Sequence, residues 1–290
     1  MRLSLVGDVH LRFDAREAAA IDAARPDAAL FVGDLGGYSH RGGLRIARAI
    51  AALRTPALVV PGNHDATHPQ QLLAEMTRHA PTIELLASGQ RARVAELRRA
   101  LGPAILAGYS VHPLRAGDDR IDCVVGRPHS FGGPHLAFRP YLRDAFGIES
   151  MEQSAERLCE LVDRTETERI LVLAHNGPTG LGARRHDLWG CDFRSSEGDF
   201  GDPDLRAAID HARGRGKRVV AVLAGHMHHA LRGGGQRTWI AREGGTLFVN
   251  AARVPRVWKH QGATMCHRVE ITIEGDHAEA REVIEAAPLA

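Results

Sequence analysis

The chain has 290 residues, of which 44% are hydrophobic and 25% charged, so it can bury the core of a large globular domain. Its formal net charge of +2 does not favour nucleic acid or an anionic membrane as a partner. No apolar stretch approaches the roughly 18 residues that a membrane helix needs, and the short apolar run at the N-terminus does not resemble a signal peptide. We therefore expect a soluble, cytoplasmic protein without a membrane partner.

The four cysteines do not form a pattern typical of a metal site or of disulfides. Cys123, Cys159, Cys191 and Cys266 include no pair in CxxC spacing, which argues against a structural zinc site. A chain of this size with so few cysteines is not a disulfide framework, and a reducing compartment is the simpler interpretation.

Five short apolar runs occur along the chain, and a residue that can bind a metal follows each of them closely. Apart from Ser4 in the first run, the runs are apolar throughout, which is typical of strands buried on both faces. Glycine comes before several of the polar residues and permits a tight turn. The runs are residues 3–6, 28–32, 57–60, 170–174 and 219–224, and the polar residues after them begin at Asp8, Asp34, Asn63, His175 and His226.

Helical patterns separate these runs, so the chain alternates between strand and helix. This alternation predicts an α/β protein with right-handed crossovers, in which ligands bind at the carboxyl ends of the strands. All five polar motifs fall at such ends and are expected to converge on one site. The helical patterns cover residues 15–24, 44–53, 69–79, 151–165 and 202–212, the last with Asp202 as its cap and Pro203 in its first turn.

The last part of the chain and one middle segment have a different pattern. Residues 244–250, 265–273 and 278–284 are expected to form strands, and helical pattern is scarce after residue 215. This predicts a mostly antiparallel sheet in the second half. Residues 107–146 are rich in glycine and proline, and we interpret them as a substrate-loop insertion in a single domain that spans residues 1–290.

The polar motifs supply the side chains that a phosphoester hydrolase with two metal ions requires. Two divalent ions can clamp phosphoryl oxygens and lower the pKa of a water between them, and such a pair needs about seven or eight ligand groups. Histidine nitrogen suits Zn and Fe, whereas carboxylate and amide oxygens suit Mn and Mg. The seven candidate ligands are Asp8, His10, Asp34, Asn63, His175, His226 and His228.

This set resembles the motif series of the calcineurin-like metallophosphoesterase superfamily: Asp-x-His, Gly-Asp, Gly-Asn-His-Asp/Glu, a single His and Gly-His-x-His. The five motifs occur here in the same order between Asp8 and His228, so the resemblance covers most of the chain. It implies a two-sheet β-sandwich flanked by helices, in four layers α-β-β-α. Two segments, 126–133 and 175–182, further resemble a bacterial and plant branch of the superfamily, a match that names no substrate.

The resemblance also implies a role for each candidate residue. Asp34 would bridge two divalent ions (Mn, Fe, Zn or Ni), and a hydroxide between the ions would attack a phosphomonoester or a phosphodiester. His64 would be the general acid that protonates the leaving group. The first ion would be held by Asp8, His10 and His228, and the second by Asn63, His175 and His226.

One position departs from the family pattern. Many members have an acidic residue three positions after the bridging aspartate, where it orients the catalytic histidine, and this chain has Gly37 there. Asp65 is the candidate to replace that acid. Without a replacement, His64 would be held less firmly.

The sequence indicates the substrate contacts less clearly than the metal ligands, and it leaves competing functions open. Arg127 could clamp phosphate bidentately, with a structural ion pair as the alternative, and His129 shares this ambiguity. A small-molecule phosphoester is the expected substrate, and the sequence carries no signal for an oligomeric state. One alternative is a metal-dependent nuclease. The low net charge does not favour it, although Arg41, Arg45 and Arg48 could form a local basic groove. The other alternative is a non-catalytic metal-binding scaffold of the same fold.

Overall fold

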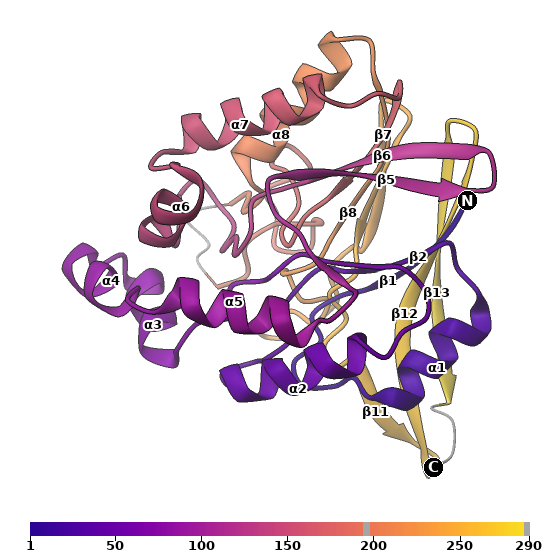
Figure 1. Cartoon of the computed structure of the whole chain (residues 1–290), viewed down its shortest axis with the longest axis horizontal. Helices are drawn as coiled ribbons and strands as arrows, with labels where there is room; N and C mark the ends of the chain where they lie inside the picture. The colour runs from indigo at the N-terminus through magenta and orange to yellow at the C-terminus, as the bar shows by residue number, and fades with distance from the viewer. Residues whose placement is uncertain (194–197, 287–290) are drawn as a thin grey trace.

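The computed structural model describes residues 1–193 and 198–286. Within these ranges two β-sheets pack face to face, and helices cover the outer face of each sheet (Figure 1). This is the four-layer α-β-β-α sandwich that the family resemblance implied. None of the helices in the described part of the chain is long and apolar enough to cross a bilayer.

The first sheet contains seven strands and both ends of the described chain. Its strands β1 to β4 run parallel, and β12 pairs antiparallel with β1. The order is β11-β12-β1-β2-β3-β4, with β13 paired to β12. The strands are β1 (Arg2–Val6), β2 (Ala28–Phe31), β3 (Ala57–Val59), β4 (Ile105–Leu106), β11 (Val257–His260), β12 (Ala263–Glu274) and β13 (His277–Ala286).

The second sheet contains six strands and is also mixed. Strands β6, β7, β8 and β10 run parallel, while β5 and β9 are antiparallel at the two edges. The order is β5-β6-β7-β8-β10-β9. The strands are β5 (Ser110–Ala116), β6 (Asp119–Val125), β7 (Arg169–Leu173), β8 (Arg218–Ala224), β9 (Ile240–Glu243) and β10 (Thr246–Asn250).

Helices from the two halves of the chain cover opposite sides of the sandwich. In Figure 1, α1, α2 and α5 lie along the first sheet, and α7 and α8 lie along the second. Helices α3 and α4 pack on each other beside the end of α5. The helices are α1 (Ala15–Ala24), α2 (His40–Ile50), α3 (Pro69–Thr77), α4 (Ala80–Leu86), α5 (Gln90–Ala100), α6 (Arg139–Phe146), α7 (Met151–Asp163) and α8 (Pro203–Gly214).

The central strands are buried on both faces, as their continuous apolar runs predicted. Leu30 of β2 packs between the sheets, whereas its neighbour Phe31 packs under the helices. In the second sheet, Leu171 of β7 faces the first sheet and Val172 faces the helices. Successive side chains of these central strands therefore point into different apolar layers, and this packing on both faces holds the ends of the central strands in place.

Residues 107–146 do not form the substrate-loop insertion expected from their glycine and proline content. They contain β5, β6 and α6, and β6 pairs with β7 inside the second sheet. The pattern was obscured because β5 is an edge strand with few buried positions, and because its Pro113 is tolerated at an edge. The segment is thus part of the sandwich.

The expectation of a mostly antiparallel second half is also wrong in part. Strands β11, β12 and β13 are antiparallel and join the first sheet. Strands β8 and β10, however, run parallel in the second sheet. The crossover between them contains β9 and irregular chain instead of a helix, so the strand–helix alternation that marks a parallel pair is missing from the sequence.

The packing between the sheets predicts a large stability difference between two leucine variants. Leu223 of β8 is fully buried between the sheets, whereas the side chain of Leu85 on α4 is 74% exposed. We expect Leu223→Ala to lower the free energy of unfolding by about 2–5 kcal/mol, because it leaves a cavity in a closely packed layer. Leu85→Ala should change it by less than about 0.5 kcal/mol. Urea denaturation of both variants measures the difference, and equal losses would contradict this packing.

Candidate metal centre

The five polar motifs lie in loops at the carboxyl ends of five strands. Strands β1, β2 and β3 of the first sheet and β7 and β8 of the second end at the same edge of the sandwich. Because the two sheets pack face to face, their loops meet there. The structure thereby brings together all seven ligand candidates and His64, from positions up to 220 residues apart in sequence.

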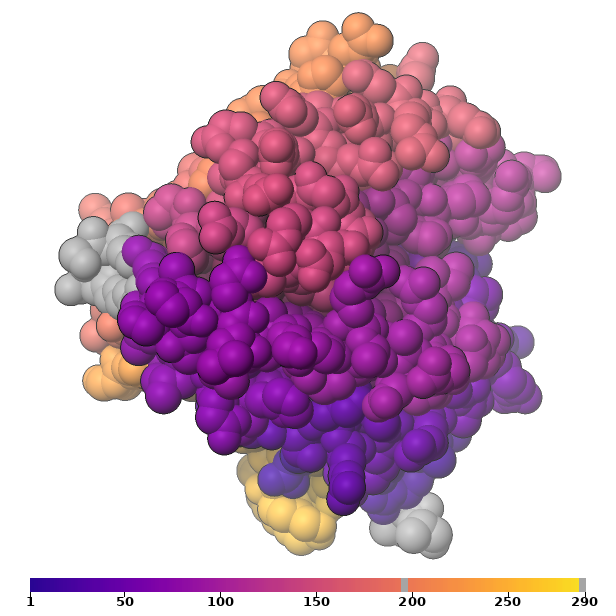
Figure 2. Space-filling view, turned by 60° about the vertical axis from the view of Figure 1, so that its left-hand side comes forward, coloured from indigo at the N-terminus to yellow at the C-terminus, as the bar shows by residue number. Residues whose placement is uncertain are grey.

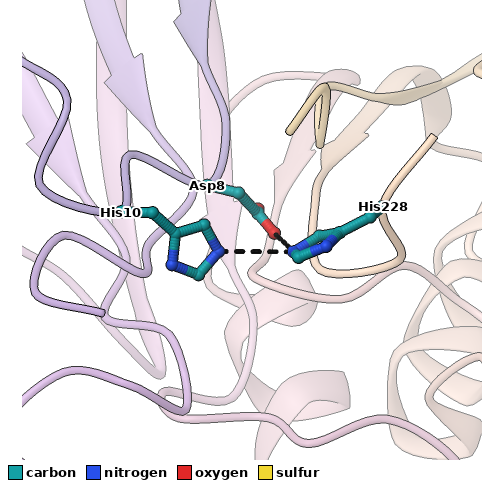
Figure 3. A group of neighbouring side chains, drawn as sticks. All are labelled: Asp8, His10 and His228. Carbon is teal, nitrogen blue, oxygen red and sulfur yellow. Dashed lines mark hydrogen bonds and ion pairs between the residues drawn. The ribbon is translucent and has the colours of Figure 1, made fainter. Parts of the chain in front are cut away.

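One group consists of Asp8, His10 and His228, whose side chains point toward one another (Figure 3). Nε2 of His10 lies 3.3 Å from Nε2 of His228, and Nε2 of His228 lies 3.3 Å from Oδ2 of Asp8. The carboxylate is fully buried, and its other oxygen accepts a hydrogen bond from the backbone N–H of His226. The orientation of Asp8 is therefore set by the loop after β8.

The second group consists of Asn63, His175 and His226. Nε2 of His175 lies 2.9 Å from Oδ1 of Asn63 and 3.1 Å from Nδ1 of His226. Nδ1 of His175 donates to the carbonyl oxygen of Val32, a contact that leaves Nε2 as the acceptor nitrogen. Three side chains from different strands thus direct a nitrogen or an oxygen at one point.

Asp34 lies between the two groups. Its Oδ2 is 3.8 Å from Nε2 of His10, and its Oδ1 is 3.6 Å from Nε2 of His175. Oδ1 also accepts a hydrogen bond from the backbone N–H of His64. One buried carboxylate therefore faces both groups, which is the position that a bridging ligand requires.

The residues present fit a pair of divalent cations. Oδ2 of Asp8 is buried and makes no hydrogen bond of normal geometry to any described residue, although leaving a buried carboxylate oxygen without a partner is costly. The histidine nitrogens converge on each other instead of on protein donors. A mixed set of imidazole nitrogens, carboxylate oxygens and one amide oxygen is compatible with Mn, Fe, Zn or Ni.

At Asp34 and His226 the electrostatics favour the protonation states that bind metals. Burial would raise the pKa of Asp34, but the histidines around it, His64 first, outweigh burial and hold the pKa below its ordinary value. Burial, together with the neighbouring His175, lowers the pKa of His226 to about 3. An ionised carboxylate and a neutral imidazole are the forms that coordinate a cation.

The loops hold these side chains in unusual backbone conformations. Asp8, His10, Asp34 and His226 have φ values of 40°, 42°, 52° and 70°, in a region that costs non-glycine residues roughly 1–3 kcal/mol each. Gly62 is required for a different reason, since a Cβ atom there would lie 2.2 Å from Oδ1 of Asp34. The glycines of the motifs thus make room for the carboxylates.

His64 is oriented by the backbone instead of by a carboxylate. Its Nδ1 donates to the carbonyl oxygen of Gly37 at 2.7 Å, so the position that lacks the usual acidic side chain still provides the acceptor. Nε2 of His64 lies 3.9 Å from Oδ2 of Asp34, on the side of the two ligand groups. The expectation that His64 would be held less firmly without an acid is therefore not supported.

Asp65 does not replace the missing acid. Its carboxylate accepts hydrogen bonds from the backbone N–H groups of Leu35, Gly36 and Gly62. These bonds connect the loop after β2 to the loop after β3. Asp65 thus fixes the distance between Asp34 and Asn63, while the backbone of Gly37 orients the ring of His64.

Arg127 is buried behind the site, where it pairs with two carboxylates. Its Nε lies 3.0 Å from Oδ2 of Asp204, and one terminal nitrogen lies 3.1 Å from Oδ1 of Asp202. The side chain is 2% exposed, and the residue does not line the cleft. This arrangement favours the structural ion pair over phosphate binding. Asp202, the expected helix cap, turns its side chain to Arg127 and Ser130 instead.

His129 is also buried, and it supports the loop that carries Asn63. Its Nδ1 donates to the carbonyl oxygen of Gly62, and its backbone N–H donates to that of Pro61. Burial lowers the pKa of His129 to about 4, so the ring is neutral at pH 7. Its position favours a supporting role over a substrate contact.

The cleft in front of the ligand groups has a volume of about 250 Å³ and contains side chains that the sequence patterns did not identify. Most of them lie outside the motifs, so only their spatial position reveals them. Two lie inside segments already discussed: Met227 is the variable residue of the Gly-His-x-His motif, and Phe131 falls in the segment 126–133 that resembles the narrower branch. The additional lining residues are Tyr38, Met76, Phe131, Asp192, Phe193, Met227, Ala230 and Arg232.

The buried ion pairs predict that Arg127 is essential for stability. Arg127→Met leaves Asp202 and Asp204 buried without their cation, and we expect the free energy of unfolding to fall by about 3–5 kcal/mol. Arg215→Met is the matched control, because Arg215 forms an exposed ion pair with Asp163 and should contribute little. Chemical denaturation of both variants tests this. A variant Arg127→Met as stable as Arg215→Met would show that the buried pairs contribute no net stability.

Comparisons with known proteins agree with this geometry. The family model described as calcineurin-like phosphoesterase matches residues 1–230. None of the curated proteins matches the chain. Among solved structures, the chain is similar to TT1561 of Thermus thermophilus, with 12% identity and a TM-score of 0.54 over 97% of each chain. It is also similar to PhoD, with 10% identity and a TM-score of 0.56 over 99% of this chain and 68% of that one.

At such low identity the structural similarities show a shared fold and nothing about substrates. The family model carries more weight, because it spans most of the chain and contains all five motif loops. This chain therefore belongs to the calcineurin-like phosphoesterase family.

Proposed function

We propose that this protein is a phosphoesterase with two divalent metal ions in one site, which hydrolyses a phosphomonoester or phosphodiester of a small molecule. The observation that carries the proposal is the position of Asp34, a buried carboxylate that faces two convergent ligand groups while His64 lies beside it. Family membership supports the same reaction class.

Each side chain has a proposed role in holding the ions. When bound, the two ions would clamp phosphoryl oxygens and lower the pKa of a water molecule, which makes it a nucleophile at neutral pH. Asp34 would contact both ions. One ion would be held by Asp8, His10 and His228, and the other by Asn63, His175 and His226.

His64 is proposed as the general acid. Because Nδ1 of His64 donates to Gly37, the ring is fixed with Nε2 directed toward the cleft. A proton on Nε2 can be donated to the leaving oxygen, which would otherwise depart as an alkoxide. The neutral carbonyl of Gly37 orients the ring without adding a second negative charge beside Asp34.

Neither alternative function has comparable support. A nuclease would need a basic surface along its substrate, and Arg232 is the only arginine or lysine among the described residues that line the cleft. Arg41, Arg45 and Arg48 are exposed on α2 and do not line it. A scaffold would need neither His64 nor a full ligand set, and this chain retains both.

The first test is metal content together with hydrolysis. We expect metal-loaded protein to hold about two equivalents of Mn and to hydrolyse p-nitrophenyl phosphate or bis(p-nitrophenyl) phosphate. Asp34→Asn should lose at least one equivalent and reduce turnover by on the order of 100-fold or more, because the bridging charge contributes several kcal/mol. Elemental analysis and absorbance assays measure both quantities. Two bound ions without hydrolysis of any phosphoester would instead favour the scaffold.

A second test isolates the role of His64. We expect His64→Ala to slow hydrolysis of an alkyl phosphate by about 10²- to 10⁴-fold, because the alkoxide needs a proton as it leaves. Hydrolysis of the p-nitrophenyl ester should slow much less, since that leaving group is stable as an anion. Metal content should remain that of the wild type. Equal slowing of both esters would argue against proton donation by His64.

A further inference from the structure

Aromatic side chains from three separate segments line the cleft in front of the ligand groups. Tyr38 lies in the loop after β2, Phe131 in the loop after β6, and Phe193 in the segment between β7 and α8. Met76 of α3 adds a fourth apolar side chain. The metal centre therefore opens into a small cleft whose walls are largely apolar.

Tyr38 is the most unusual of these residues. Its side chain is 71% exposed although it lies directly beside the proposed general acid, with its ring 4.8 Å from the ring of His64 between centroids. Its hydroxyl makes no hydrogen bond to any residue in the described ranges. Core packing does not explain an aromatic ring in this position, since large exposed apolar groups next to a cleft are typical of ligand contacts.

The rings of Phe131 and Phe193 are held in place by contacts with neighbouring residues. The backbone carbonyl of Phe131 accepts a hydrogen bond from Nε2 of His226, and the two rings are 6.0 Å apart. Phe193 packs edge-on against Phe200 at 5.0 Å, and the guanidinium of Arg232 lies 5.7 Å from its centroid. Both rings are thus held in place, which lowers the entropic cost of binding a flat group against them.

The walls of the cleft offer few polar groups that could form hydrogen bonds with a substrate. Asp192 is already engaged, because its Oδ2 accepts the backbone N–H of Arg232 and its Oδ1 pairs with Arg237. Apart from Tyr38 and Arg232, the remaining polar side chains of the cleft belong to the ligand set or to His64. A polyhydroxylated group such as a sugar would lose its hydrogen bonds to water here without replacement, whereas a hydrocarbon aryl ring has none to lose.

We infer that the group attached to the scissile phosphate is a planar aromatic ring, bound against Tyr38, Phe131 and Phe193. This inference rests on the proposed phosphoesterase function and specifies its substrate class. A cleft of about 250 Å³ lies below the usual range for drug-sized ligands, so it suits one ring system with its phosphate. An aryl alcohol supplies such a group directly, whereas the nucleobase of a nucleotide is separated from its phosphate by a ribose.

Direct binding to metal-loaded protein tests the inference without turnover. Phosphonates keep the phosphate geometry but have a carbon–phosphorus bond that this reaction does not cleave. We expect isothermal titration calorimetry to show phenylphosphonate binding at least about 5-fold more tightly than cyclohexylphosphonate, because stacking on a fixed ring favours a flat group. A non-hydrolysable phosphonate analogue of adenosine monophosphate, in which a ribose separates the ring from phosphorus, should bind less tightly than phenylphosphonate. Tighter binding of phenylphosphonate than of both other ligands supports the inference, whereas tighter binding of the nucleotide analogue would overturn it.

Two variants show whether Tyr38 causes the preference. Tyr38→Leu should reduce the preference for the planar ligand to less than about twofold, whereas Tyr38→Phe, which keeps the ring, should retain it. Equal affinities of phenylphosphonate and cyclohexylphosphonate in the wild type would overturn the inference. So would a preference that survives in Tyr38→Leu.

Inorganic phosphate separates this inference from the proposed function. If phosphate binds to metal-loaded wild type and the planar ligand has no advantage, only the substrate class is wrong. If phosphate does not bind and no ester is hydrolysed, the proposed function fails, and the inference fails with it. The affinity for phosphate should differ by less than about twofold between the wild type and Tyr38→Leu, since phosphate has no ring.

Discussion

A buried carboxylate surrounded by histidines is the constraint on which the rest of this structure depends. Asp34 lies at the edge of the sandwich with His10, His64 and His175 within 4 Å of its oxygens. An ionised carboxylate is stable there only if positive charge or hydrogen bonds surround it, and this requirement brings loops from both sheets to one point. The face-to-face packing of the sheets satisfies it, because the carboxyl ends of β2 and β7 meet at that edge.

The motif loops are strained because of this convergence. Four ligand candidates have a left-handed backbone, which only firmly placed strand ends can maintain. The apolar layers on both faces of β1, β2, β7 and β8 provide that firmness. Buried polar groups add to it: Asp65 connects two loops through backbone N–H groups, and Arg127 connects the loop after β6 to the start of α8. Stability and the geometry of the site are therefore linked.

The ligand groups and the walls of the cleft have different origins in the fold. The ligand candidates follow central strands directly, and the sheets determine their positions. Tyr38, Met76 and Phe193 lie farther from the strand ends, on chain that the sheets do not constrain. Members of one fold family can therefore keep the same metal chemistry while their cleft walls change, which is why a family match indicates a reaction class and leaves the substrate to be argued from the cleft.

The amino-acid sequence alone determined the central strands, most helices and the seven ligand candidates, because these depend on local patterns. A doubly buried strand needs a continuous apolar run, and a ligand loop needs glycine beside its polar residues. Only the tertiary structure decided the rest. It placed β5 and β6 in the sheet although proline and glycine obscured their pattern, and it paired Arg127 with Asp202 and Asp204 instead of exposing it to substrate. It also assigned the backbone of Gly37 to orient His64, a role that no side-chain motif could reveal. All three features depend on residues that are distant in sequence: the pairing of an edge strand, the burial of a charge and the direction of a carbonyl group. For that physical reason, only the packing of the sheets determines them.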